Sequence, residues 1–217
     1  MRLRSALVMA CLAMFMLGSV SSAFAALPTF LVETGSLPVK FEGSAGQTRI
    51  EFVGEVILEC KNIKVAGEVT SAHAGTYKMA FEKCETLLGI ECHTTGDAKG
   101  ILLWSGEFHL VRIALSPTQV GMLMSLPTLT SSCLGEFATH ESKGFVLPIT
   151  PINTFTKSFT LTAAQFKGVQ AFTSYYNEAG TLVTGAYLLL TSGPKQFALE
   201  IPTSISLTME RKSEIQA

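Results

Sequence analysis

The chain has 217 residues, of which 47% are hydrophobic and 15% charged, and its formal net charge is −1 at pH 7. Disordered chains have a lower share of hydrophobic residues than this one. Electrostatic binding to nucleic acid needs an excess of basic residues, which this chain lacks. The composition therefore predicts a folded protein without a nucleic-acid partner.

The first 25 residues have the three parts of an export signal. Two arginines precede an apolar run from Ala6 to Leu17, and Ala23-Phe24-Ala25 places small residues at the −3 and −1 positions of a cleavage site. The run is shorter than the ~20 residues that a membrane-spanning helix needs. We therefore expect residues 1–25 to be a signal peptide. Residues 26–217 would then form a single secreted β-rich domain, outside the cell or at the cell envelope, with no membrane span after cleavage.

Four cysteines follow the predicted signal peptide. An even number of cysteines in an exported chain predicts disulfides, here two of them. A zinc site is disfavoured, because no pair has the Cys-x-x-Cys spacing and the expected compartment is oxidising. The four residues are Cys60, Cys84, Cys92 and Cys133.

A predicted hairpin distinguishes between the possible pairings. Apolar residues alternate with polar ones on both sides of the segment Ser71-Ala72-His73-Ala74-Gly75, which is typical of two strands and a loop. Folding about Ala72 places Ile63 opposite Phe81, and the same register places Cys60 opposite Cys84. Bridged cysteines need Cα atoms within about 7 Å. The hairpin therefore favours a Cys60–Cys84 disulfide, and Cys92–Cys133 follows by elimination.

The rest of the chain is also typical of strands. No window shows a helical period with caps, and apolar segments recur every 8 to 12 residues or so, separated by turn residues and by the polar stretch Thr139-His140-Glu141-Ser142-Lys143. We predict an all-β, antiparallel β-sandwich or flattened barrel with two disulfides and about eight to eleven strands. The segments are Gly100–Leu115, Val120–Leu126, Gly144–Ile149, Phe159–Ala163, Ala171–Tyr176, Thr181–Thr191 and Phe197–Met209.

The last of these segments has the longest alternation. Its odd positions from Phe197 to Met209 are apolar apart from one threonine, and its even positions are mostly polar. Pro202 cannot donate a hydrogen bond to a sheet, so we expect an edge or a bulge at that residue.

Titratable residues give little support for catalysis. Asp97 is the sole aspartate, there is no Gly-x-Ser-x-Gly nucleophile motif, and a nucleophilic cysteine would leave an odd number of thiols. We expect the histidines to make ordinary hydrogen bonds. They are His73, in the hairpin loop; His93, beside a cysteine; His109, on a strand; and His140, in a polar loop.

Two further groups of residues have functional and structural interpretations. Glu51, Glu55 and Glu59 share one face of a predicted strand, where carboxylates could serve glycoside hydrolysis, but alternation alone explains their spacing. The aromatic residues Trp104, Phe108, Tyr175 and Tyr176 could stack on sugar rings, although filling a core is the more common role. The sequence therefore predicts no catalytic, cofactor-binding or metal-binding residues.

The motifs around the cysteines resemble those of a large group of uncharacterised secreted proteins of actinobacteria. The resemblance covers about residues 50–171, and it departs from the group's pattern at Lys83 and Thr94, where the group has glycine and serine. It implies secretion, disulfides and β structure, and it supplies no catalytic residues. The motifs are Cys60, Cys84-Glu85, Cys92-His93-Thr94-Thr95-Gly96, Val120-Gly121-Met122-Leu123, Cys133, Ile149-Thr150-Pro151-Ile152-Asn153, Phe159-Thr160-Leu161, Gly168 and Gln170.

Two functions are consistent with these observations. We expect a non-catalytic domain that binds, coats or scaffolds at the cell surface or outside the cell. The alternative is a secreted hydrolase whose site is assembled from scattered glutamate and histidine residues. An exposed apolar patch would favour binding, and a pocket with two glutamates or a His-Glu pair in contact would favour the enzyme.

Overall fold

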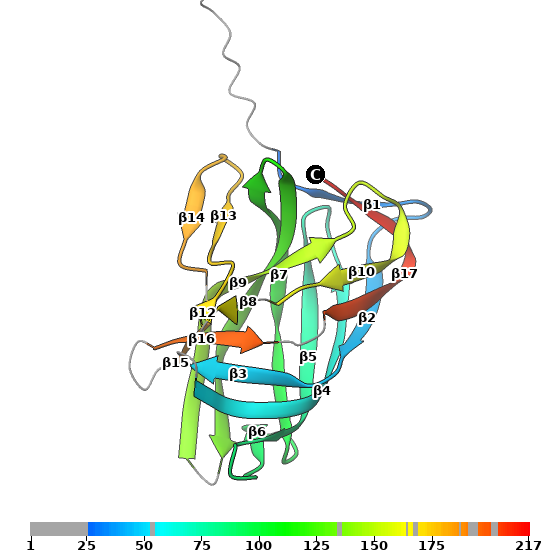
Figure 1. Ribbon diagram of the computed structural model, residues 1–217. Helices are drawn as coiled ribbons and strands as arrows, with labels where there is room; N and C mark the ends of the chain where they lie inside the picture. Colours follow the sequence, from blue (N-terminus) through cyan, green and yellow to red (C-terminus); the bar gives the residue numbers. More distant parts are fainter. Residues whose placement is uncertain are drawn as a thin grey trace, which may run out of the picture.

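The computed structural model consists of strands joined by turns and loops (Figure 1). It describes residues 26–52, 55–133, 136–163, 165–166, 169–186, 188–190, 195–200 and 204–217. The predicted signal peptide, residues 1–25, and Pro202 lie outside these ranges. Within them every regular element is a strand, which confirms the predicted all-β class.

Fifteen of the described strands belong to one antiparallel sheet, and β11 and β12 form a separate two-stranded ribbon. In chain order the strands are β1 (Thr29–Val32), β2 (Val39–Ala45), β3 (Thr48–Phe52), β4 (Glu55–Val69), β5 (Ala74–Glu85), β6 (Cys92–Thr94), β7 (Ile101–Leu115), β8 (Thr118–Cys133), β9 (Glu136–Thr150), β10 (Thr156–Leu161), β11 (Gln165–Phe166), β12 (Val169–Gln170), β13 (Ser174–Tyr176), β14 (Leu182–Thr184), β15 (Leu188–Leu190), β16 (Lys195–Glu200) and β17 (Ile205–Gln216).

The sheet closes on itself as a barrel. Strands β4, β5, β7, β8 and β9 follow one another as antiparallel neighbours. The free edge of β4 pairs with β2 along one half and with β3 along the other. The free edge of β9 pairs with β10 near one end and with β15 near the other. β17 then joins β10 to β2, and β16 joins β15 to β3. Of the two predicted architectures, the pairing therefore forms the barrel.

Large side chains fill the interior of the barrel. Trp104 is 1% exposed, and its ring meets the rings of Phe81 and Phe145 edge-on, with centroids 4.6 and 6.1 Å apart. Near the end of the barrel that contains Phe30 and Ile215, a cavity of about 20 Å³ has an apolar lining. That volume holds about one water molecule. An eight-stranded barrel can be filled by side chains or can hold one small ligand, and in this barrel large side chains occupy the interior.

A second apolar layer lies outside the barrel. Between β10 and β15 the chain forms β11 to β14, and part of this segment packs against the outer face of β7, β8 and β9. The contact centres on the buried residues Val111, Val146 and Ala186, with Phe172 and Tyr175 packed against them. Backbone pairing of β13 with β7 fixes this segment in place. Because this segment covers their outer face, β7 and β9 carry buried apolar residues on both faces.

The structure confirms the predicted first hairpin residue by residue. β4 and β5 pair with Cys60 opposite Cys84, Ile63 opposite Phe81 and Val65 opposite Met79. Both predicted disulfides are present, Cys60–Cys84 with Cα atoms 4.0 Å apart and Cys92–Cys133 with Cα atoms 4.4 Å apart. Apolar alternation and cysteine proximity therefore identified the same register.

Two predicted strand boundaries are wrong. The polar stretch 139–143, expected to separate strands, lies inside β9, and β8 continues past Leu126, the expected end of a segment, through Pro127 to Cys133. The two strands pair with each other as far as Cys133 opposite Glu136, so backbone hydrogen bonding continues through polar sequence. The register shifts between Leu126 and Leu129, and such a bulge accommodates a proline that cannot donate to the ladder.

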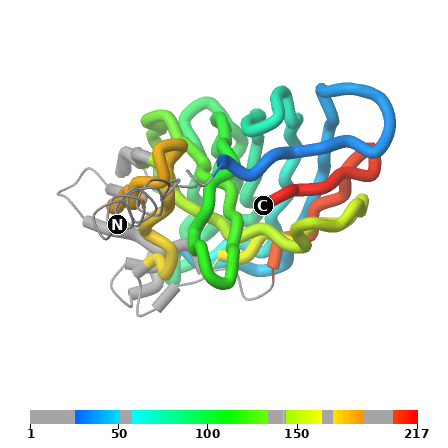
Figure 2. The backbone as a smooth tube through the Cα atoms, turned by 90° about the horizontal axis from the view of Figure 1, so that it is seen from above, coloured from blue at the N-terminus to red at the C-terminus, as the bar shows by residue number. Residues whose placement is uncertain are grey.

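The predicted strand from Phe197 to Met209 corresponds to β16 and to the first part of β17. Ile205, Leu207 and Met209 are buried, whereas Ser206 and Thr208 are exposed, so the alternation is confirmed there. β17 also continues beyond Met209 to Gln216 and pairs with β1, as Figure 2 shows from above, where the blue and red ends of the described chain run side by side.

This alternation predicts opposite outcomes for neighbouring substitutions. Leu207→Asp should lower the free energy of unfolding by more than about 4 kcal/mol, because it loses apolar burial and places a carboxylate in the barrel core. Ser206→Asp, which points outward, should change it by less than about 1 kcal/mol. Denaturant unfolding of both variants measures the difference. Equal stability of the two would contradict the burial of the Leu207 side chain.

Candidate functional site

The structure does not bring the four histidines together. The Nδ1 atom of His73 lies 2.9 Å from the carbonyl oxygen of Pro28, an ordinary hydrogen bond as expected. His93 lies on β6, and its buried Nδ1 has no hydrogen-bond partner among the described residues. His109 is exposed on β7, and His140 lies in β9 rather than in a loop. Among the described residues, no three His, Cys, Asp or Glu side chains converge as a metal site.

The prediction that three glutamates share one face of a single strand is wrong. Glu51 lies near the end of β3, whereas Glu55 and Glu59 belong to β4, which pairs with β3 in antiparallel fashion, so the three residues do not lie on one strand. The Oε1 atom of Glu59 accepts a hydrogen bond from Nε of Arg49 at 2.8 Å.

Most of the aromatic residues that could have stacked on sugars are structural. Trp104 and Phe108 are 1% and 2% exposed in the barrel core, and Tyr175 packs against the second apolar layer. Tyr176 lies on β13 and is half-buried. The core interpretation is therefore confirmed for the first two residues.

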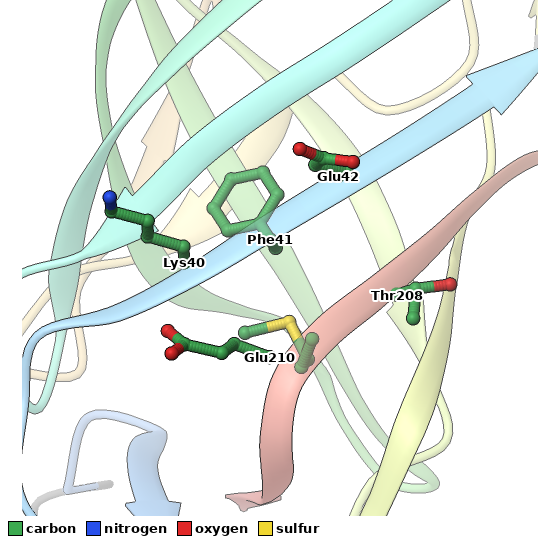
Figure 3. Close-up of a pocket in the computed structure, with 6 residues that line it drawn as sticks. Lys40, Phe41, Glu42, Thr208 and Glu210 are labelled. Atoms are coloured by element: carbon green, nitrogen blue, oxygen red, sulfur yellow. The ribbon is translucent and has the colours of Figure 1, made fainter.

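The outer face of the barrel carries two neighbouring hollows that share Glu42. The first lies where β2 meets β17, has a volume of about 340 Å³, and is lined by three consecutive residues of each strand, Lys40 to Glu42 and Thr208 to Glu210 (Figure 3). The second, also about 340 Å³, extends over β4 and β5. We call the two together the outer groove. Its second hollow is lined by Glu42, Gly43, Lys64, Val65, Ala66, Lys78 and Ala80.

Strand geometry explains why the surface is hollowed at this place. Glu42, Ala66 and Lys78 are cross-strand neighbours on β2, β4 and β5, and Lys64 is opposite Ala80 in the adjacent row. Short alanines therefore alternate with long charged side chains. At the other end of the groove, β17 stops pairing with β2 after Met209 because it continues along β1.

The outer groove presents charges of both signs above an apolar floor. Lys64 donates to Glu82 at 2.7 Å, an exposed pair. Lys40, Glu42, Lys78 and Glu210 are exposed as well. The groove can therefore pair with amino and carboxylate groups of a ligand laid across the strands. Sequence analysis missed it, although the alternation of Val39 and Phe41 with Lys40 and Glu42 could have indicated β2.

Tyr77 is buried for structural reasons. Its hydroxyl donates to the carbonyl oxygen of Ser125 at 2.9 Å, and burial raises its pKa above the ordinary value of 10.0. Gly106 lies opposite Tyr77, and a Cβ atom there would collide with the same carbonyl oxygen. Tyr77 therefore connects β5 to β8 across a position where β7 has no side chain.

Comparisons with protein-family models, with curated proteins and with solved structures gave no match. No helix in the described part of the chain has the length and apolar character required to cross a membrane.

The position of Tyr77 predicts a loss of stability in alkali. A raised pKa means that the folded state favours the neutral phenol, so its contribution is complete below about pH 10 and is lost as the pH rises beyond the unfolded value. Tyr77→Phe should lower the free energy of unfolding by about 1 to 3 kcal/mol at pH 7, because Ser125 loses its donor. The deficit should shrink at about pH 11, where the unfolded phenol ionises. Urea unfolding at both values, with Tyr175→Phe as the control, measures this; a deficit independent of pH would contradict it.

Proposed function

We propose that the protein is exported and acts without catalysis, as a rigid β-domain that binds or scaffolds at the cell surface or outside the cell. One observation carries the proposal. The inside of the barrel is filled by its own side chains, whereas the two larger hollows open on the outer face. A ligand would therefore contact the outer face of the barrel, with no need to enter it.

Three features support export. The sequence begins with the pattern of a signal peptide. Two disulfides fit an oxidising compartment, because thiols are kept reduced in most cytosols. The resemblance to secreted actinobacterial proteins is consistent with both. These features together support a protein that works outside the cytoplasm.

The outer groove suits an extended partner with charges of both signs. Lysines and glutamates alternate across β2, β4 and β5, and the alanines between them leave room for a chain. A polypeptide segment or a peptide-bearing wall polymer carries the complementary amino and carboxylate groups. Such contacts lie at the surface, so each contributes little and the affinity rests on several together.

The hydrolase alternative has one observation in its favour. Glu42 and Glu210 line the same hollow, and Figure 3 draws their side chains there. Both are exposed on the outside of a sheet, where nothing excludes water from a reacting bond. Binding is therefore the better-supported function.

Export predicts a defined mature protein. When the full chain is produced in a bacterial host that secretes it, protein in the medium should begin at Ala26 and contain both disulfides. N-terminal sequencing and peptide mapping without reduction measure this. Secreted protein that retains Met1, or that links Cys60 to Cys133, would contradict the proposal.

The outer groove predicts a local effect of blocking substitutions. Ala66→Trp should reduce co-sedimentation of the exported protein with washed cell-wall sacculi about tenfold, because a large ring occupies the space between Glu42 and Lys78. Gln119→Trp, on an exposed position of β8 outside the groove, serves as the matched control. If the two variants sediment like the unmodified protein, the groove is not the binding surface. If the unmodified protein does not sediment, the wall is not the partner.

A further inference from the structure

The loop between β5 and β6 presents two leucines to solvent. Leu87 is 67% exposed and Leu88 is 86% exposed. The other exposed large hydrophobic residues among those described, Leu115, Phe155 and Leu182, are between 42% and 51% exposed and lie in three separate segments. Most of the surface of both side chains faces solvent, and a contiguous exposed apolar patch with polar neighbours can mark an interaction site.

Backbone hydrogen bonds hold these leucines in a fixed turn. The N–H of Thr86 donates to the carbonyl oxygen of Ile90 at 2.9 Å, and the N–H of Gly89 donates to the carbonyl oxygen of Thr86 at 2.9 Å. The Thr86 hydroxyl accepts from the N–H groups of Leu88 and Ile90, both at 3.3 Å. Gly89 has a φ of 75°, which glycine adopts without steric cost. The leucines therefore occupy the apex of a tight hairpin turn.

The base of the turn is anchored by both disulfides. Cys84 precedes the loop and is bridged to β4, and Cys92 follows it and is bridged to β8. Glu85 and Glu91 form a β-bridge between the two cysteines. Figure 1 places β6 at the end of the barrel opposite the C-terminus. The loop is thus a preorganised apolar tip at one end of the barrel, which we call the Leu87–Leu88 tip.

We propose that the Leu87–Leu88 tip inserts into the interfacial layer of a lipid bilayer and holds the exported protein at a membrane surface. The proposal is independent of the outer groove. Insertion would bury the two leucines among acyl chains while the barrel stays in water, which is how peripheral proteins combine apolar insertion with a folded domain.

The size of the tip favours lipid over a protein partner. A stable protein interface buries about 800 Å² on each side, and two leucine side chains provide a small part of that. A bilayer deforms around a narrow projection and requires no complementary pocket. Two leucines provide no more apolar surface than one short acyl chain, and membrane binding through one such chain is weak and reversible.

The described residues around the tip have no excess of basic charge. Lys83 is exposed next to Cys84, and Lys99 is exposed next to Gly100, whose carbonyl oxygen accepts from the N–H of Cys84. Glu85 and Glu91 flank the loop itself, Glu59 lies opposite Glu85, and Asp97 lies in the loop that follows β6. Because the tip has no basic excess, attraction to anionic lipid contributes little and binding depends on the leucines.

Vesicle binding tests the proposal. The exported protein is sedimented with vesicles of phosphatidylcholine alone and of phosphatidylcholine with phosphatidylglycerol. We expect binding to both, and a reduction of at least about tenfold for the double variant Leu87→Ser/Leu88→Ser. Leu182→Ser, which removes another half-exposed leucine, is the matched control and should bind normally. Ala66→Trp should also bind normally, which separates this site from the groove.

A second readout reports insertion directly. Trp104 is buried, so its emission should not respond to vesicles. In Leu88→Trp, vesicles should shift the emission of the new indole to the blue, and lipids brominated on the acyl chain should quench it. Absence of vesicle binding, binding that requires phosphatidylglycerol, or equal binding of the double variant would each overturn the proposal. Self-association that the double variant abolishes, without vesicle binding, would instead assign the tip to a second copy of the chain.

Discussion

The structure depends on the pairing that closes the barrel, between the start of the domain and its end. β17 meets β2 with Leu207 opposite Gly43. A Cβ atom on Gly43 would lie 2.5 Å from Cδ2 of Leu207 and from the carbonyl oxygen of Ser206. The strands can therefore approach closely because this residue is a glycine. Closure pairs the edges that an open sheet would leave exposed to other chains.

Closure also decides where function can reside. A ring of eight strand positions can be filled by its own side chains or can leave room for one small ligand. Trp104, Phe81 and Phe145 occupy the interior in this chain. A partner would therefore contact the outer face or the ends of the barrel. The outer groove arises on the face where alanines stand between charged residues, and the Leu87–Leu88 tip arises at an end.

Sequence reasoning succeeded where two independent constraints coincided. Apolar alternation allows a hairpin to slip by two residues, but Cys60 and Cys84 meet in one register alone. It failed where a strand is held by its neighbours. β17 continues through Ser213 to Ile215, both 0% exposed, because β1 supplies hydrogen bonds from a distant part of the chain. The outer groove was equally hidden, since its residues come from strands far apart in the sequence.

The end of the barrel that carries the tip has a different construction from the rest. β7 pairs with β8 from Phe108 to Leu115. Toward the tip, β8 pairs with β6 instead. The Thr94 hydroxyl accepts from the N–H of Leu103 at 2.8 Å, which ties β6 to β7. Three residues cannot hold such a position through backbone pairing alone, because a short strand has few hydrogen bonds to offset its conformational entropy. The Cys92–Cys133 bridge supplies the missing restraint, so the disulfide that keeps β6 within the wall also fixes the direction of the loop before it.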